Sequence, residues 1–591
     1  MSRRLLGCLF GGMVLATVAG CGIPGDTEVR IEGPGPAAEA GASSGGGVEP
    51  PPRKTAGSRE EFVANFLSAA AGEPDGAYDR VRQFVVTEDR ARLPQKEGSE
   101  VALTVVRLVD DPVIVPGPEE IRVTLKVQQV GQLTADGVLA PPEATPDTYD
   151  FGLRPISLEG GDETEWYVTD PPNMLLLSVD ALSRYYTPRT IYFWSSDRLR
   201  LVPDQRYLAR TVPDDRRVSE VVRWLVGGHS AWLKRAVSTL PDRTNLINNA
   251  TRTDDRWEVN LDMAGADSAR LELLATQLAW SLPELQGQLE LKIRNQSQLV
   301  IDDVEQRRQK HPVYSIGAPQ PFCVYEGAVR SLGPTGVPVV PAENDTVVSA
   351  GLSRSGQRVL AALVVETDDG RQRLAVGAGA DPLTSFRASP ETYQAVSRPV
   401  WLRSADPRRP VGLVVADGRL LRFDEAANLD QVQLSVEGVT AVAAALDGHR
   451  IAVVSDGALY VAAVSHDGDA LAVGPLRLMP TSLTGLTAVD WYGENSLVVA
   501  GSKAGKRVLY EVGVDGARET ELRATGATVT HLAAYPANPE SYGSVMYEAN
   551  GVAYRAFPFP FERINPDQVR GVEPTLTGTR TSAPSAPFLL F

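Results

Sequence analysis

The sequence predicts a multi-domain protein with an α+β N-terminal domain, a small α/β domain and an all-β C-terminal propeller of about six blades. Three observations indicate this fold class. Apolar residues change from helical spacing to strict alternation in the first part, helices and strands interleave next, and a repeat of about 46 residues fills the last part. At 591 residues the chain is too long for a single core, so several domains are expected.

Residues 1–20 resemble the signal peptide of a bacterial lipoprotein. Arg3 and Arg4 precede an apolar run, Leu5–Ala19, that is shorter than the roughly 20 residues a membrane-spanning helix needs. The run leads into VAGC at 18–21, which resembles the lipobox of bacterial lipoproteins. That resemblance implies that Cys21 carries diacylglyceryl and acyl (palmitate) groups and anchors the chain to the extracytoplasmic face of the cell membrane. The alternative is an ordinary secretory signal with an incidental cysteine.

Residues 21–57 are predicted to be a lipidated cysteine followed by a disordered tether. The segment is dense in Gly, Pro, Ala, Ser and Glu, and it has almost no large apolar residue after Ile31. It cannot bury enough apolar surface to offset the entropy that an ordered chain loses. We therefore expect a flexible spacer between the lipid anchor and the folded domains.

The net charge argues against nucleic-acid binding, and the cysteine content argues against an internal disulfide. A net charge of −16 argues against nucleic acid as a partner, because nucleic-acid binding needs a cationic surface. The three cysteines are Cys8 in the signal peptide, Cys21 and Cys323, so the mature chain has no pair for an internal structural disulfide. Cys323 lies between Phe322 and Val324 and is interpreted as a buried, inert thiol rather than a reactive one.

The α+β domain is predicted at 58–172. Ser58 and Glu61 have the spacing of a capping box, and apolar residues at helical spacing follow. After Pro94 the period changes to two, which is typical of half-buried antiparallel strands. The predicted elements are helices at 62–70 and 78–85 and strands at 101–109, 121–127 and 166–168.

The small α/β domain is predicted at 182–305. A helix beginning at Asp214 and Asp215 and ending at Gly227-Gly228 follows strands predicted at 190–194, 199–203 and 207–212. Two strands, a second helix and a final strand come next. Four tryptophans in this region are interpreted as packing residues, with an aromatic ligand site as the alternative: Trp224, Trp232, Trp257 and Trp280.

This order of elements resembles the GerMN domain of sporulation and germination proteins. The matching residues are Tyr192-Phe193, Leu201-Val202-Pro203 before Arg206, Leu225-Val226-Gly227-Gly228 and Val259-Asn260-Leu261. The resemblance implies a binding or assembly module without catalytic residues.

The propeller is predicted at 313–591 from turn phrases that recur at a fixed phase. Gly356 and Gly448 lie 92 positions apart in matching phrases, and Gly457 and Gly551 lie 94 apart. Each interval holds two units of about 46 residues, which is the length of a four-stranded blade. Six blades are expected, with five or seven as variants and a two-sheet sandwich as the alternative fold. The apolar end, 588–591, is expected to pack into the last blade rather than form a docking tail.

No catalytic, cofactor-binding or metal site is predicted. The five histidines are scattered and lack the spacings of zinc sites, and no phosphate-binding GxxxxGK[ST] loop occurs. Asp-Gly turns leave calcium as an alternative, although no EF-hand spacing exists. His466 lies in a phrase typical of a turn rather than of acid–base chemistry.

Lipobox, tether, α+β domain, GerMN-like domain and propeller occur in the order that resembles the LpqB lipoprotein family of actinobacteria. That resemblance implies a cell-envelope accessory protein that binds the extracytoplasmic domain of the sensor histidine kinase MtrB and modulates the MtrA–MtrB two-component system. The residues themselves predict only an exported, anchored, non-catalytic binder. The alternative is a propeller enzyme or lectin acting on cell-wall glycans, with acidic and aromatic residues clustered at one mouth of the propeller.

Overall fold

The computed structural model describes residues 48–590, and residues 46–591 form one compact unit. The predicted signal peptide, Cys21 and the tether as far as residue 47 lie outside the described residues. Within the described ranges, no helix combines the length and the apolar character that a membrane crossing needs. The description omits 97, 119, 144–146, 158–163, 314–318, 334–339, 341–345, 356, 404–408, 468–469, 536–542, 557–559 and 573–581.

The N-terminal domain, residues 48–185, begins with helix α1 (Arg59–Phe66). The hydroxyl of Ser58 accepts a hydrogen bond of 3.1 Å from the N–H of Glu61, as predicted for the N-cap. The Glu61 carboxylate accepts the N–H of Gly57 at 2.6 Å, so this half of the predicted capping box reaches one residue further back. Phe62 and Phe66 are buried against the sheet, and helix α2 (Ala77–Arg82) follows.

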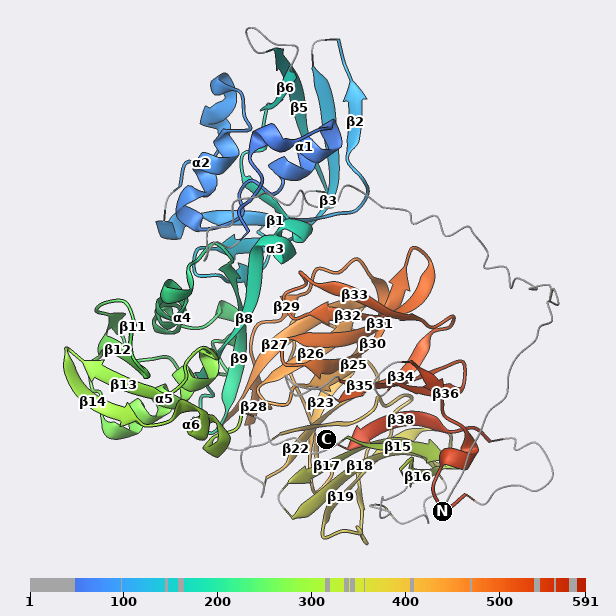
Figure 1. Ribbon diagram of the computed structural model, residues 1–591. Coiled ribbons are helices and arrows are strands. Elements are labelled where there is room, and N and C mark those ends of the chain that lie inside the picture. The colour runs from blue at the N-terminus through green and yellow to red at the C-terminus, as the bar shows by residue number, and fades with distance from the viewer. Residues whose placement is uncertain are drawn as a thin grey trace, which may run out of the picture. The chain divides into compact units, whose positions relative to one another are not determined.

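The sheet of this domain has the strand order β6-β5-β3-β1-β7, and β2 and β4 also pair with β3 (Figure 1). Side chains along the first half of β3 alternate between buried and exposed, which confirms the predicted half-buried strand. The strands are β1 (Ala102–Leu108), β2 (Val113–Pro116), β3 (Ile121–Thr134), β4 (Leu139–Ala140), β5 (Thr148–Ser157), β6 (Thr164–Thr169) and β7 (Leu175–Ser178).

Both boundaries of this domain differ from the prediction. Strand β7 lies beyond residue 172 but pairs in parallel with β1, and helix α3 (Val179–Tyr185) continues the domain. At the other end, Arg53 belongs to the predicted tether, yet its guanidinium lies 2.6 Å from Glu165 and 4.1 Å from the ring centre of Tyr167. Arg53 and Glu165 are 112 positions apart, so local composition does not reveal the contact.

The middle domain, residues 186–310, opens with the hairpin β8 (Tyr186–Trp194) and β9 (Leu201–Ala209). The two strands predicted at 199–203 and 207–212 are one continuous strand, β9. Helix α4 (Asp214–Gly227) has its predicted bounds, and Gly228 ends it with a φ of 94°, which favours glycine. The second sheet has the order β10-β12-β13-β14, and β11 also pairs with β12. The remaining elements are β10 (Asn245–Leu246), β11 (Thr251–Thr253), β12 (Arg256–Asp262), α5 (Ser268–Ser281), β13 (Gln288–Ile293), β14 (Gln296–Ile301) and α6 (Val304–Lys310).

The described residues of the C-terminal domain form six antiparallel sheets, which confirms a propeller and the expected blade number (Figure 1). Type I′ hairpin geometry appears where the turn phrases predict it, with positive φ at both residues of Asp417-Gly418, Asp456-Gly457 and Asn550-Gly551. The strands of the complete blades are β17 (Val347–Ser355), β18 (Arg358–Glu366), β19 (Gln372–Gly379), β20 (Arg387–Ala388), β21 (Val400–Leu402), β22 (Val411–Ala416), β23 (Arg419–Asp424), β24 (Leu429–Gln431), β25 (Val439–Ala444), β26 (Arg450–Ser455), β27 (Ala458–Asp467), β28 (Ala470–Val473), β29 (Arg477–Leu478), β30 (Thr484–Gly493), β31 (Ser496–Lys503), β32 (Lys506–Gly513), β33 (Glu519–Ala524), β34 (Val529–Tyr535), β35 (Ser544–Ala549), β36 (Val552–Ala556) and β37 (Glu562–Arg563).

The ring closes by joining its two ends in one blade. The last strand, β38 (Ser585–Leu590), pairs with β15 (Gln320–Tyr325), which in turn pairs with β16 (Ala328–Ser331). Phe588 stacks on Phe322 with ring centres 5.7 Å apart, so packing of the apolar end is confirmed for residues 585–590. Successive strands β17, β21, β25, β30, β34 and β38 contact one another and surround the central channel.

Candidate functional site

The middle domain and the propeller meet through buried hydrogen bonds. The Tyr207 hydroxyl donates to the Asp515 carboxylate at 2.6 Å, and the side-chain amide of Gln205 donates to the same oxygen at 2.8 Å. Burial and the charge of Asp515 hold the pKa of Tyr207 well above its ordinary value. Nearby, Tyr192 donates to Glu494 at 2.6 Å. These contacts hold β8 and β9 against the turns that follow β30 and β32.

The N-terminal domain also contacts the propeller directly. The Arg107 guanidinium donates to the carbonyl of Gly516 at 2.5 Å and lies 3.4 Å from the carboxylate of Glu519. In the other direction, Arg477 of the propeller donates to the carbonyl of Leu139 at 2.8 Å. Because all three domains share buried polar contacts, they present their surfaces in a fixed relation to one another.

Arg206, one of the residues that match the GerMN pattern, holds the middle domain together from inside. Its side chain is fully buried and donates to Asp204 at 2.9 Å and to the carbonyl of Gly228 at 2.7 Å. Asp204 also accepts the hydroxyl of Ser230 at 2.6 Å. The matching residues around the double glycine are therefore structural, because they fix the end of α4 against β9.

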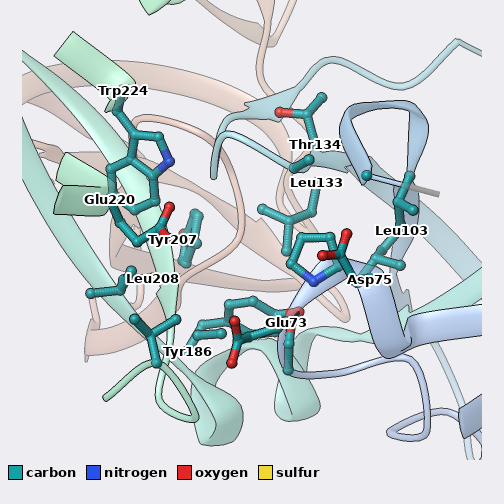
Figure 2. Close-up of a pocket in the computed structure, with 17 residues that line it drawn as sticks. Glu73, Asp75, Leu103, Leu133, Thr134, Tyr186, Tyr207, Leu208, Glu220 and Trp224 are labelled. Carbon is teal, nitrogen blue, oxygen red and sulfur yellow. Dashed lines mark hydrogen bonds between the residues drawn. The ribbon is translucent and has the colours of Figure 1, made fainter. Parts of the chain in front are cut away.

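A cavity of about 220 Å³ lies between the N-terminal and middle domains. Figure 2 shows Trp224 and Glu220 of α4 on one side and Leu103 and Leu133 of the N-terminal sheet on the other. Several of its polar groups already have partners: Glu73 pairs with Arg216, Glu220 with Arg223, and the hydroxyl of Tyr186 donates to the carbonyl of Gly72. This cavity is a seam between two domains whose polar groups stabilise the fold.

The four tryptophans of the middle domain do not form one ligand site. Trp224 lines the cavity of Figure 2, Trp232 packs against the propeller core, and Trp280 donates to the carbonyl of His311 at 2.7 Å. Trp257 is buried in the core that the N-terminal and middle domains share. Within the described residues no ring contact joins any two of them, so their interpretation as packing residues holds.

The central channel of the propeller is closed by an ion pair. Arg398 lies 2.7 Å from Asp490, and both line a small inner cavity of about 20 Å³. Asp490 also accepts the backbone N–H groups of Trp491 and Ala534, each at 2.9 Å. Burial raises the pKa of Asp490, while the Arg398 charge and these hydrogen bonds oppose the rise.

Above this ion pair the channel widens into a cavity of about 280 Å³, which we call the mouth. Arg398 forms its floor, because this residue lines both the mouth and the inner cavity. Hydroxyl side chains from successive blades form much of its wall, His531 also lines it, and its described lining residues include no Phe, Tyr or Trp. The hydroxyl residues are Ser349, Ser397, Thr440, Thr487 and Thr530.

Bulges at the start of the innermost strands help to place these hydroxyls. The register of β25 shifts between Val439 and Ala441, and that of β34 shifts between Val529 and His531, so Thr440 and Thr530 are the extra residues. In β17 the shift lies between Val347 and Ser349. A bulge re-aims a side chain locally, so the mouth is built by a recurring backbone feature.

The structure also places the thiol and the histidines that the sequence analysis considered. Burial raises the pKa of Cys323 to about 12, which keeps its thiol protonated. Among the described residues, no group of three or more His, Cys, Asp or Glu side chains is arranged to hold a metal ion. His449 and His466 pack edge to face with ring centres 5.9 Å apart, beside Asp197 of the middle domain, and they form part of the packed domain contact.

Sequence reasoning missed the mouth, although a signal for it exists. Thr440, Thr487 and Thr530 each follow an apolar residue and precede a blade's innermost strand segment, at intervals of 47 and 43 positions. Arg398 and Asp490 carry no motif, since the ring brings together residues 92 positions apart. Cys21, the one site residue that the sequence predicts, lies outside the described residues and stays a prediction.

Three family models match successive parts of the chain. The model described as "Lipoprotein LpqB, N-terminal domain" matches residues 51–183, "Sporulation and spore germination" matches 190–298, and "Lipoprotein LpqB beta-propeller domain" matches 328–554. These ranges follow the three domains of the structure.

Curated relatives are similar along nearly the whole length. The protein named Lipoprotein LpqB from Mycobacterium paratuberculosis is 24% identical over 93% of this chain and 96% of its own length. The proteins of the same name from Mycolicibacterium smegmatis and Cutibacterium acnes are each 25% identical, and they cover 87% and 90% of this chain and 89% and 94% of their own lengths. The similarity therefore includes the order of all three domains.

Proposed function

The chain belongs to the family of LpqB lipoproteins, and we propose from this premise that it is a membrane-anchored, extracytoplasmic binding protein without catalytic activity. The proposed anchor is the lipid on Cys21. The proposed partner is the extracytoplasmic domain of the sensor histidine kinase MtrB, and binding modulates the MtrA–MtrB two-component system and cell-envelope homeostasis.

The observation that carries this proposal is the construction of the propeller mouth. Propellers bind through the loops and strand ends at one end of their channel. The middle domain packs against the turns after β30 and β32, which contain Glu494 and Asp515. The mouth lies at the opposite ends of the same strands, beside Thr487. The fold therefore leaves this end of the channel facing away from the middle domain.

The mouth also favours binding over catalysis. The carboxylate beneath its floor, Asp490, already accepts three hydrogen-bond donors, so it is poorly placed to act as a general base. Ser349 has no hydrogen-bonded base that would activate it as a nucleophile among the described residues. These arrangements support a site that binds the surface of another protein and catalyses no reaction.

Co-purification from native membranes tests this function. Full-length chain with a C-terminal affinity tag is expressed in its own host and solubilised in mild detergent after brief chemical crosslinking. We expect MtrB to be enriched at least about tenfold over a tagged, unrelated lipoprotein. Absence of MtrB enrichment in replicate captures, with the chain itself recovered, would contradict the proposed partner.

The glycan-binding alternative makes a different prediction. Sugar sites in proteins commonly present the faces of Trp, Tyr or Phe rings with acidic groups, and the described residues that line the mouth include none of these three. Incubation of the purified full-length chain with cell-wall fragments distinguishes the two functions. Saturable pull-down or release of soluble sugars would favour the alternative, and recovery at the level of a heat-denatured control would favour protein binding.

A further inference from the structure

We propose that the mouth of the propeller channel is a pocket for the carboxylate of an acidic side chain presented on a loop of a partner protein, with Arg398 as its recognition residue. The inference rests on the proposed function in one respect: it assumes that the ligand is a protein. It adds which chemical group of that protein the mouth recognises.

The floor of the mouth offers hydrogen-bond donors that the fold does not use. A guanidinium has five N–H groups, and Arg398 donates to Asp490 through one terminal nitrogen. Its other N–H groups make no hydrogen bond to any described residue, and its side chain is 18% exposed. Unused hydrogen-bond donors at the bottom of a cavity favour a ligand with hydrogen-bond acceptors. A carboxylate, which is charged, accepts the strongest hydrogen bonds from a guanidinium.

Ser349 is a second, independent observation at the same place. Its side chain is 2% exposed and lines the mouth, yet its hydroxyl oxygen has no hydrogen-bond partner in the described part of the chain. A buried hydroxyl without a partner destabilises the fold, because it has lost its hydrogen bonds to water and gained none in the protein. A ligand that accepts this hydroxyl proton relieves the cost, so the fold carries a group that is satisfied only on binding.

The wall of the mouth, unlike its floor, offers hydrogen-bond acceptors. The hydroxyls of Thr440, Thr487 and Thr530 donate to the carbonyls of Val454, Val529 and Glu548, at 3.4, 3.2 and 3.4 Å. With their protons engaged, these oxygens can only accept from a ligand. A wall that accepts and a floor that donates match a peptide loop, whose backbone N–H groups surround an acidic side chain.

Size and shape fit such a loop. The mouth of about 280 Å³ lies just below the range of roughly 300–1,000 Å³ for small-molecule pockets, so it holds one side chain with part of its turn. Valine and leucine side chains between the hydroxyls, such as Val396, Val442 and Leu532, supply apolar contact for the stem of that side chain. The ion pair below prevents deeper entry.

Peptide binding to the purified full-length chain in detergent tests the proposal. The probes are the capped pentapeptide Gly-Ser-Glu-Ser-Gly, cyclised to hold a turn, and its counterpart with Gln in place of Glu. Binding is followed by saturation-transfer NMR titration. We expect the Glu peptide to bind about tenfold more tightly than the Gln peptide, because a hydrogen bond to a charged carboxylate is stronger than one to a neutral amide. Equal affinity of the two peptides would overturn the proposal.

Variants locate the site. The double variant Arg398→Met with Asp490→Asn removes both charges together, which avoids leaving a buried carboxylate unpaired, and it is expected to abolish the preference for Glu. Ser349→Ala is expected to weaken Glu-peptide binding about threefold. The matched control is Arg354→Met with Asp381→Asn, an ion pair of 3.1 Å in the same propeller outside the mouth. If the proposal is right, the control variant still binds the Glu peptide more tightly than the Gln peptide. If the control variant loses this preference while the Arg398→Met, Asp490→Asn variant keeps it, the proposal is wrong.

The two proposals fail separately. If MtrB co-purifies with both wild type and the Arg398→Met, Asp490→Asn variant in equal yield, the proposed function stands and the mouth pocket is wrong. If the Glu peptide binds the mouth but MtrB is never captured, the pocket stands and its protein partner is another one.

Discussion

The hydroxyl of Tyr207 lies 2.6 Å from the carboxylate of Asp515, although the two residues are 308 positions apart and belong to different domains. Both are buried, at 8% and 4% exposure, so water does not replace the contact when it breaks. We therefore expect the middle domain and the propeller to unfold in a coupled way, because each shields the polar groups of the other.

Tyr207→Phe tests this coupling. The change leaves Asp515 with Gln205 as its remaining side-chain partner and removes one hydrogen bond to a charged group, which is worth about 1.5–3 kcal/mol. Urea unfolding followed by tryptophan fluorescence should show that loss of stability or a split into two transitions. Tyr78→Phe is the control, because the Tyr78 hydroxyl makes no hydrogen bond among the described residues. A wild-type unfolding curve for Tyr207→Phe would contradict the coupling.

Closure of the propeller by β38 makes a second prediction. Phe588 is fully buried and stacks on Phe322, so Phe588→Ala should cost about 3–5 kcal/mol of unfolding free energy. Leu478→Ala, at a position 55% exposed, should change it by less than about 0.5 kcal/mol. Differential scanning calorimetry of both variants measures the difference. Similar stability of the two would show that the terminal strand does not close the ring.

The fold class was predictable because propellers repeat their turns. Asp456-Gly457 and Asn550-Gly551 need positive φ at both positions, so the turn chemistry marks the blade period in the sequence itself. For the closure of the ring, the sequence predicted only that the apolar C-terminal residues pack into the last blade. Its partner strand, β15, lies at the start of the domain, and nothing local to Phe588 identifies it.

The sites were less predictable than the fold. Arg398 and Asp490 have unremarkable neighbours in the sequence, and only the ring of strands brings them to one channel. The join of Arg53 to Glu165 was missed for the same reason: a proline-rich segment has the composition of a tether whether or not a distant carboxylate binds it. Ion pairs between residues far apart in the chain produce no periodic pattern in the sequence.

The packed pair of His449 and the partly buried His466 predicts a pH dependence of stability. Burial, and then the neighbouring His449, hold the pKa of His466 below its ordinary value of 6.5, with Arg422 acting in the same direction and Asp197 and the backbone of Gly448 opposing. The unfolded chain then binds this proton at a higher pH than the folded chain does. The stability is therefore present above about pH 6.5 and is lost as the pH falls through the folded pKa.

Urea midpoints between pH 5 and pH 7.5 measure this dependence. His466→Gln should flatten the decline toward pH 5, because glutamine does not titrate. His311→Gln, at an exposed position, should leave the wild-type profile unchanged. A profile for His466→Gln that still falls as steeply as wild type would assign the pH dependence to other groups.

The lipid anchor gives a prediction that involves no described residue. Cys21→Ala removes the thiol that the lipobox resemblance implies is acylated, so the chain should appear in the medium or accumulate as a larger precursor. Cys8→Ala, inside the predicted signal peptide, should leave the chain in the detergent phase. Phase partitioning with immunoblotting measures both. Unchanged detergent partitioning of Cys21→Ala would contradict the anchor.

The central claim is that the mouth of the propeller binds the extracytoplasmic domain of MtrB. A photo-crosslinking amino acid placed at Thr440, on the exposed wall of the mouth, tests it in intact cells, with the same group at Leu478 on the outer edge of a blade as the control. Mass spectrometry of the crosslinked product should identify peptides of MtrB from the Thr440 position and none above background from Leu478. No MtrB from Thr440, or equal yields from the two positions, would contradict the account.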